Sequence, residues 1–189
     1  MALVIGLVGE KGSGKETFGD FFEEAAKQSE LSVLRIRFSD VLIQTLQLWS
    51  LEPSRENLQK LAVVMKDGFG PDTLTHAISE LIKNSKADLI VIDGVRWLPD
   101  RDLIRKFPEN KLVYITATQE LRFERLKTRT LTYRKNETQS FEQFIKEEGA
   151  ENELYIPLIG EQADFKIENN ADLEDFETKV KKLYLSLTH

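Results

Sequence analysis

The chain has 189 residues, of which 41% are hydrophobic and 31% are charged, and its formal net charge is −6. This composition is typical of a globular protein, and the acidic balance argues against general nucleic-acid binding, which needs a basic surface. The sequence has no cysteine and only two histidines, which excludes disulfides, thiolate chemistry and a zinc cluster. No apolar run approaches the roughly 20 residues that cross a bilayer, so we expect a cytoplasmic protein that binds neither membrane nor nucleic acid.

Apolar and amphipathic segments alternate along the chain, with no internal repeat and no linker that marks a second domain. Short apolar runs predict strands over residues 2–8, 32–38, 88–92, 111–116 and 163–168. Helical spacing predicts helices over residues 15–29, 100–107, 119–128 and 173–187, and three more that begin near Asp40, Ser54 and Pro71. The alternation predicts one α/β domain, residues 1–189, whose mostly parallel sheet is covered by helices on both faces.

A glycine-rich segment separates the first strand from the first helix. It consists of Gly9, Glu10, Lys11, Gly12, Ser13, Gly14, Lys15, Glu16 and Thr17. Strand, glycine-rich loop and helix form the context of a phosphate-binding loop, in which backbone N–H groups and the positive end of the helix dipole surround a phosphate. Lys15 supplies a mobile ammonium group, which can stay close to the negative charge as that charge moves between the β- and γ-phosphates. The segment therefore predicts binding of a nucleoside triphosphate.

One position departs from the standard loop pattern, which places Ser or Thr directly after the lysine as a magnesium ligand. Here that position is Glu16, and the hydroxyl follows one residue later as Thr17. GTPases and most motor-type ATPases need the hydroxyl at the first position, so the departure favours a small-molecule kinase. Direct ligation of the metal by Thr17 stays open.

Charged residues follow the second and third predicted strands, at the edge of the sheet where ligands bind in open α/β folds. Asp40 is a candidate to accept a hydroxyl proton, bind a ribose or contact magnesium, and its alternative role is a helix N-cap. Asp93 is a candidate to orient magnesium or its waters, and Arg96 to bind a phosphate bidentately. Arg55, near the start of a helix, is a candidate clamp for an acceptor phosphate.

A basic tract begins on the helix predicted over residues 119–128. Arg122, Arg125 and Arg129 recur at three- and four-residue spacing, so they lie near one helix face, and Arg134 extends the tract. Arginines that reach across a transferring phosphoryl group stabilise its charge, which favours a mobile arginine lid. The alternative is ordinary surface charge paired with acidic neighbours, namely Glu142, Glu147 and Glu148. Otherwise we expect Glu147 and Glu148 to lie on a solvated helix face.

In this order the motifs resemble those of the nucleoside monophosphate kinase superfamily over essentially the whole chain. The sequence is most similar to adenylate-kinase-related proteins described in archaea, and more distantly to deoxynucleoside monophosphate kinases and dephospho-coenzyme A kinases. The resemblance rests on the loop and on four further motifs: Ser39-Asp40-Val41, Asp93-Gly94-Val95-Arg96, Arg122-x-x-Arg125, and a closing run with Ala163, Asp164, Ile167 and Asn169.

The resemblance implies a three-layer P-loop fold with strand order 2-3-1-4-5, ATP and Mg²⁺ on the loop, and a nucleotide acceptor across the cleft. A helical segment over about residues 40–86 would bind the acceptor, and the polar tract over about residues 130–153 would form a lid. Arg96 would bind the acceptor phosphate, Arg125 and Arg129 would lie near the donor, and the backbone around Asn169 would approach the adenine.

Two classes of function follow from the sequence. The first is an ATP-dependent kinase acting on a nucleoside monophosphate or a nucleotide-like acceptor. Dephospho-coenzyme A kinase is an alternative within this class, because Asp40 could deprotonate a ribose hydroxyl, although that family usually has Ser directly after the loop lysine. The second class is a nucleotide-binding ATPase or switch that acts on a protein partner. The identity of the acceptor, the preference for ATP over GTP and the number of subunits stay open.

Overall fold

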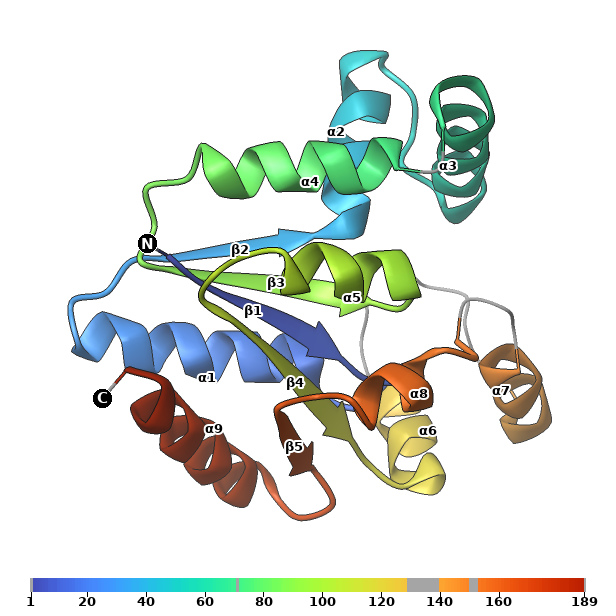
Figure 1. Ribbon diagram of the computed structural model, residues 1–189. Helices are drawn as coiled ribbons and strands as arrows, with labels where there is room; N and C mark the ends of the chain where they lie inside the picture. Colours follow the sequence, from blue (N-terminus) through green and yellow to red (C-terminus); the bar gives the residue numbers. More distant parts are fainter. Residues whose placement is uncertain (1, 71, 129–139, 150–152, 189) are drawn as a thin grey trace.

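The fold is built on a five-stranded parallel sheet in the order β2-β3-β1-β4-β5 (Figure 1). The computed structural model describes residues 2–70, 72–128, 140–149 and 153–188. The strands are β1 (Leu3–Val8), β2 (Val33–Arg37), β3 (Leu89–Val95), β4 (Asn110–Thr116) and β5 (Phe165–Glu168). The predicted strand order 2-3-1-4-5 is therefore confirmed.

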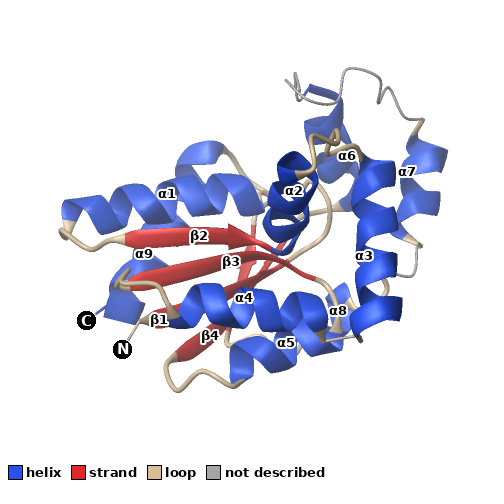
Figure 2. Cartoon of the chain, turned by 90° about the horizontal axis from the view of Figure 1, so that it is seen from above, coloured by secondary structure: helices blue, strands red, loops and turns tan. Residues whose placement is uncertain are grey.

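Helices cover both faces of the sheet, which makes three layers (Figure 1). One face carries α1 (Lys15–Gln28) and α9 (Leu173–Thr188). The other carries α2 (Phe38–Leu48), α4 (Thr73–Lys83), α5 (Leu98–Arg105) and α8 (Ile156–Gly160). Figure 2 shows the remaining helices toward the carboxyl ends of the strands: α3 (Arg55–Phe69), α6 (Gln119–Thr128) and α7 (Phe141–Glu148). Within the described ranges, every helix is too short or too polar to cross a membrane.

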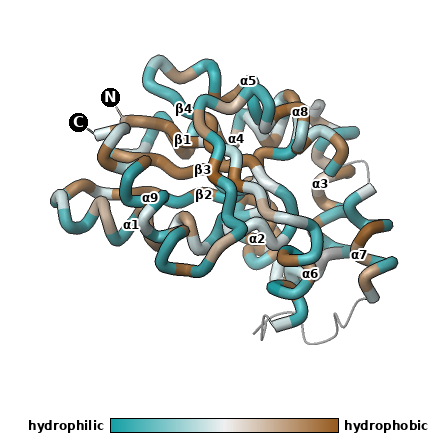
Figure 3. The backbone as a smooth tube through the Cα atoms, turned by 90° about the horizontal axis from the view of Figure 1, so that it is seen from below, coloured by the Kyte–Doolittle hydropathy of each residue, from teal (hydrophilic) through white to brown (hydrophobic). Residues whose placement is uncertain are grey.

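The period-two alternation of strand side chains separates two apolar cores. Ile5 and Leu7 of β1 pack on the face of α1 and α9, while Val4 and Val8 pack on the face of α4 and α5. Figure 3 shows hydrophobic colouring along β1 and β3, which are two of the three inner strands of the sheet. Because both faces of these strands are buried, their sequences are continuously apolar rather than alternating.

Two helices begin earlier than the sequence predicts. The predicted N-cap Asp40 is wrong: α2 begins at Phe38, and the Asp40 carboxylate instead accepts a hydrogen bond of 2.8 Å from the backbone N–H of Arg37. Asp100 plays the same part in α5, which begins at Leu98. In both cases an aspartate at the third helical position binds the free N–H group one turn upstream. Strand β2 therefore ends at Arg37 rather than at residue 38.

Helix α7 lies in the tract over about residues 130–153 that the sequence predicts only as polar and charged, and α8 follows that tract. A helix nonetheless begins after Ser140, whose hydroxyl accepts from the N–H of Gln143 at 3.2 Å. Phe144 of α7 and Ile156 and Ile159 of α8 are fully buried. Within the expected polar tract, Phe144 is thus a buried side chain that anchors α7, and the two isoleucines of α8 lie just after the tract. The predictions that fall on Pro71, Arg129 and Arg134 lie outside the described residues.

Candidate functional site

The glycine-rich loop connects Val8 of β1 to Lys15 of α1. Gly12 and Gly14 have φ angles of 82° and 107°, in the left-handed region that favours glycine. A Cβ atom at Gly12 would lie 2.6 Å from the carbonyl oxygen of Arg122, so a side chain has no space there. These two glycines let the chain turn tightly before the first turn of α1, which contains Lys15, Glu16 and Thr17.

The Lys15 side chain folds back over the loop. Its Nζ donates hydrogen bonds to the carbonyl oxygens of Gly9 at 2.7 Å and Glu10 at 3.0 Å. Burial lowers the pKa of Lys15, and the negative charge of Asp93 opposes that shift in part. A phosphate would supply the anionic partner that this half-buried ammonium needs. The loop is therefore suited to an anionic ligand.

Four buried polar atoms surround the loop without a hydrogen-bond partner among the described residues. They are the Ser13 Oγ, Glu10 Oε2, Asp93 Oδ1 and Arg125 Nη1 atoms. Buried polar groups are usually paired, so a cluster of unpaired ones fits a ligand that brings its own polar atoms. The set contains both hydrogen-bond donors and acceptors. Phosphate oxygens would accept from the donors, and the water molecules of a hydrated metal ion would donate to the acceptors.

The other carboxylate oxygen of Glu10 has a partner in the sheet. Tyr114 of β4 donates its hydroxyl to Glu10 Oε1. Burial, followed by the hydrogen bond to Glu10, raises the pKa of Tyr114 to about 12. The phenol therefore stays protonated at neutral pH and remains a donor that fixes the first part of the loop.

Asn169 connects the end of β5 to the loop and to α6. Its side chain donates to the carbonyl oxygen of Ser13 at 2.9 Å and accepts from Arg125 Nη2 at 3.2 Å. A Cβ atom at Gly14 would lie 2.5 Å from the Asn169 amide nitrogen, so the two residues are in close contact. The structure thus brings Asn169 and Arg125 together at the loop, while their contact with a nucleotide stays a prediction.

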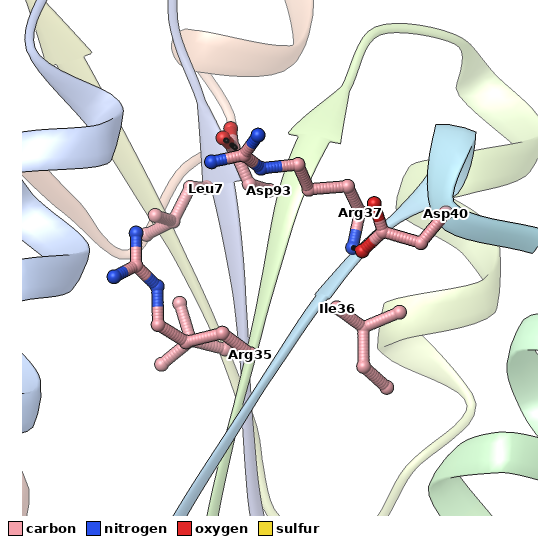
Figure 4. Close-up of a pocket in the computed structure, with 7 residues that line it drawn as sticks. Leu7, Arg35, Ile36, Arg37, Asp40 and Asp93 are labelled. Carbon is pink, nitrogen blue, oxygen red and sulfur yellow. Dashed lines mark hydrogen bonds and ion pairs between the residues drawn. The ribbon is translucent and has the colours of Figure 1, made fainter. Parts of the chain in front are cut away.

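A cavity of about 300 Å³ opens beside the loop, on the α1 face of the sheet near the ends of β2 and β3 (Figure 4). Two arginines and two aspartates give it a mixed charge; its lining is Leu7, Arg35, Ile36, Arg37, Asp40, Val91 and Asp93. The structure therefore brings the predicted residues Asp40 and Asp93 to one cavity. Arg35 and Arg37 were not predicted. Their signal is the two-residue spacing in β2, which places both side chains on the same face of the sheet.

Two glutamates of α7 contact the residues around the loop. Glu148 accepts hydrogen bonds from Arg122 Nη1 and from Gln119 Nε2, the latter at 2.6 Å, and Glu147 pairs with Lys11 at 3.2 Å. The Arg122 side chain is only 8% exposed. The expectation that Glu147 and Glu148 face solvent is wrong. Arg122 pairs with an acidic neighbour, as the alternative predicts, but it is buried and is not a surface charge.

These contacts give different surroundings to the arginines that the sequence predicts on one face of α6. Arg122 is buried under α7, whereas Arg125 points to Asn169. Arg96, the predicted acceptor-phosphate ligand, follows β3 and pairs with Glu153 at 2.5 Å. The side chain of Arg55 lies outside the described part of the structure.

We expect the substitution Glu148→Gln to loosen α7 without unfolding the protein. It keeps the size of the side chain but leaves the Arg122 charge without its carboxylate, at a cost of about 1–2 kcal/mol. Amide hydrogen exchange in α7 should therefore become about tenfold faster, while exchange in β3 should not change. The exposed Glu142 on the same helix supplies the control, Glu142→Gln. Equal exchange in the two variants would contradict a role for Glu148 in holding α7.

No protein-family model matches the chain. Curated relatives match it over nearly their whole length, although at low identity. A UPF0200 protein from Thermococcus gammatolerans is 28% identical over 186 residues, which cover 96% of this chain and 93% of the relative. A UPF0200 protein from Hyperthermus butylicus is 25% identical over 186 residues, with 98% and 95% coverage. These names state no activity.

The solved structures that share the fold include three kinases. Shikimate kinase from Bacteroides thetaiotaomicron has a TM-score of 0.62 at 14% identity and covers 99% of both chains. Shikimate kinase from Acinetobacter baumannii, in complex with shikimate, has a TM-score of 0.57 at 21% identity over 100% of this chain and 96% of its own. A gluconokinase from Sinorhizobium meliloti has a TM-score of 0.57 at 17% identity, with 98% and 93% coverage. The chain therefore has the fold of the P-loop kinases.

Proposed function

We propose that this protein is an ATP-dependent phosphotransferase that transfers a phosphoryl group to a nucleoside monophosphate or a similar nucleotide acceptor. The observation that carries the proposal is the loop at Gly9–Thr17. It holds the half-buried Lys15 ammonium over two carbonyl groups, among buried polar atoms that have no partner in the described residues. Phosphoryl transfer needs mainly positioning and neutralisation of charge, and both can be supplied by such a loop.

The donor nucleotide would be held by the loop N–H groups, by Ser13 and by Lys15. Asp93, with one unpartnered oxygen, and Thr17, in the first turn of α1, are the candidates to hold Mg²⁺ or its waters. No group of three histidine or carboxylate side chains suited to a metal occurs within the described ranges, so phosphate oxygens and water would supply the other ligands. The ion would neutralise charge on the phosphates.

The acceptor would bind on the side of the cavity and of Arg96. The resemblance to nucleoside monophosphate kinases supports Arg96 as the group that binds an acceptor phosphate. Its present partner is the Glu153 carboxylate, a group that a phosphate can replace. Asp40 lines the same cavity as Asp93, which places a second carboxylate on this side.

A hydroxyl acceptor is the second candidate, and the size and charge of the cavity favour it. About 300 Å³ lies at the lower end of the range for ligand sites, and the carboxylates of Asp40 and Asp93 can accept hydrogen bonds from hydroxyl groups. Two of the kinases with this fold are named for small hydroxy acids, shikimate and gluconate. Dephospho-coenzyme A, which presents a ribose hydroxyl, belongs to the same candidate class.

A coupled assay of ADP release would test the proposed function. The nucleoside monophosphates, dephospho-coenzyme A, shikimate and gluconate are each supplied with Mg²⁺ and ATP, beside a control without acceptor. We expect ADP release above the control with one acceptor class, and the nucleoside monophosphates are the expected class. Release of ADP at one rate with every acceptor and without any would instead favour an ATPase or switch that acts on a protein partner.

We expect Arg96→Ala to separate the acceptor site from the donor site. Loss of a bidentate contact to the acceptor phosphate should raise the acceptor KM or lower kcat by about 10- to 100-fold, with little change in the affinity for a non-hydrolysable ATP analogue measured by isothermal titration. Arg101→Ala is the matched control, because Arg101 contacts Asp102 and Gln162 rather than the loop. If Arg96→Ala lost donor binding as severely as a Lys15 variant, this division of the site would be wrong.

A further inference from the structure

The guanidinium of Arg37 lies between two carboxylates from different elements. Its Nη2 atom donates to Glu16 Oε1, in the first turn of α1, at 3.2 Å. Its Nε atom lies 3.9 Å from Asp93 Oδ2, near the end of β3. Figure 4 shows the Arg37 side chain reaching across the cavity toward Asp93. One arginine of the sheet thus joins the phosphate-loop helix to the carboxylate that is the candidate to orient magnesium.

The two arginines of the cavity are held very differently. Arg35 donates to Asp20 at 2.5 Å and to the carbonyl oxygen of Glu16 at 3.2 Å, and it lies 3.8 Å from Glu23. It also packs over Gly19, where any Cβ atom would collide with the Arg35 guanidinium. These contacts fix Arg35 against α1, so that it holds β2 to the helix rather than remaining available to a ligand.

Arg37 is held loosely by comparison. Its side chain is 48% exposed, and its contact with Asp93 is long. Exposed ion pairs of this kind contribute little and exchange partners readily. Of the two arginines, Arg37 is therefore the one that a bound ligand can displace.

Glu16, one of the two partners of Arg37, stands at a position of the loop that usually binds the metal ion. Glu16 occupies the place where the standard loop pattern has a metal-binding hydroxyl, and here its carboxylate holds Arg37 instead. The Oδ1 atom of Asp93 is buried and has no hydrogen-bond partner in the part of the chain that is described. An ion at Asp93 and the Arg37 guanidinium would therefore compete for the same carboxylate.

We propose that Arg37 is a positioning residue that competes with Mg²⁺ for Asp93 and so links the donor site to the acceptor cavity. This inference rests on the proposed function. Before nucleotide binds, Glu16 and Asp93 hold Arg37. When Mg²⁺ arrives with the nucleotide, Arg37 leaves Asp93, stays with Glu16 and directs its charge into the cavity that it lines. Binding of the donor thereby makes the cavity more positive for an anionic acceptor, which is a coupling between two sites.

The test measures binding and needs neither turnover nor an acceptor. The probe is the non-hydrolysable analogue AMP-PNP, titrated calorimetrically over a series of Mg²⁺ concentrations. In Arg37→Met the Mg²⁺ concentration for half-maximal binding should fall by about three- to fivefold, because the competing cation is gone and an exposed pair is worth no more than that. Arg101→Met, which removes the same charge outside the cavity, should match the wild type.

A measurement on the wild type keeps the test independent of any variant. The Nε–H nuclear magnetic resonance signal of Arg37 should move when Mg²⁺ is added to the AMP-PNP complex, while that of Arg35 should stay in place. An unchanged Mg²⁺ requirement in Arg37→Met, or a stationary Arg37 signal, would overturn the inference and leave the proposed function standing. Failure of the wild type to bind AMP-PNP at any Mg²⁺ concentration would overturn both.

Discussion

Lys15→Ala is expected to lower the rate of phosphoryl transfer by about 100- to 1,000-fold, as the loss of one preorganised electrostatic contact to a transition state commonly does. The Lys15 ammonium already lies over the loop, held by the carbonyl oxygens of Gly9 and Glu10. Its charge acts most strongly on the charge that develops between the β- and γ-phosphates. The rate of acceptor-dependent ADP release measures the effect.

The control for this substitution comes from the same helix. Lys27 is exposed and pairs with Glu23 at the far end of α1, so Lys27→Ala removes the same charge and a similar volume outside the site. We expect it to keep the wild-type rate, and both variants to keep the far-ultraviolet circular dichroism spectrum of the folded protein. A folded Lys15→Ala protein that turned over at the wild-type rate would refute the proposed function.

Gly12→Ala is expected to destabilise the protein by about 2–3 kcal/mol and to weaken nucleotide binding. The φ angle of Gly12, 82°, costs an alanine about 1–2 kcal/mol. In addition, the new Cβ atom would lie 2.6 Å from the carbonyl oxygen of Arg122, which is backbone and cannot rotate away. Urea denaturation measures the free energy of unfolding, and calorimetric titration of AMP-PNP measures the binding.

Gly68→Ala is the matched substitution. Gly68 lies in α3, and a Cβ atom there would meet nothing within 4 Å. Because alanine favours a helix over glycine, we expect this variant to be more stable by about 0.5–1 kcal/mol. If the free energy of unfolding rose in Gly12→Ala as it is expected to rise in Gly68→Ala, the loop would not need its left-handed turn.

The sequence predicts the strands of the sheet well. Buried parallel strands are continuously apolar, whereas the helices that alternate with them along the chain are amphipathic, so the two kinds of segment are easily told apart. The helix starts are less predictable. An aspartate that binds a free N–H group serves equally well at the N-cap or at the third helical position, so Asp40 and Asp100 do not by themselves fix where α2 and α5 begin.

The parts of the site that depend on distant pairing are not visible in the sequence. Arg122 and Glu148 are separated by 26 residues, and no local spacing shows that one is buried against the other. Arg37 shows the same limit, because its partner Glu16 lies 21 residues earlier in the chain. The loop itself is predictable because its glycines, lysine and helix are contiguous, whereas the residues that surround it come together only through the fold.

The acidic side chains around the loop have a consequence for how an anion enters it. Lys11 and Arg122 already have partners in Glu147 and Glu148. A triphosphate that binds the loop as proposed would therefore compete with these glutamates for the basic side chains and would not meet a field of uncompensated positive charge. Added salt screens the internal pairs and the incoming ligand together. The affinity for nucleotide should accordingly depend less on ionic strength than the number of basic residues around the loop suggests.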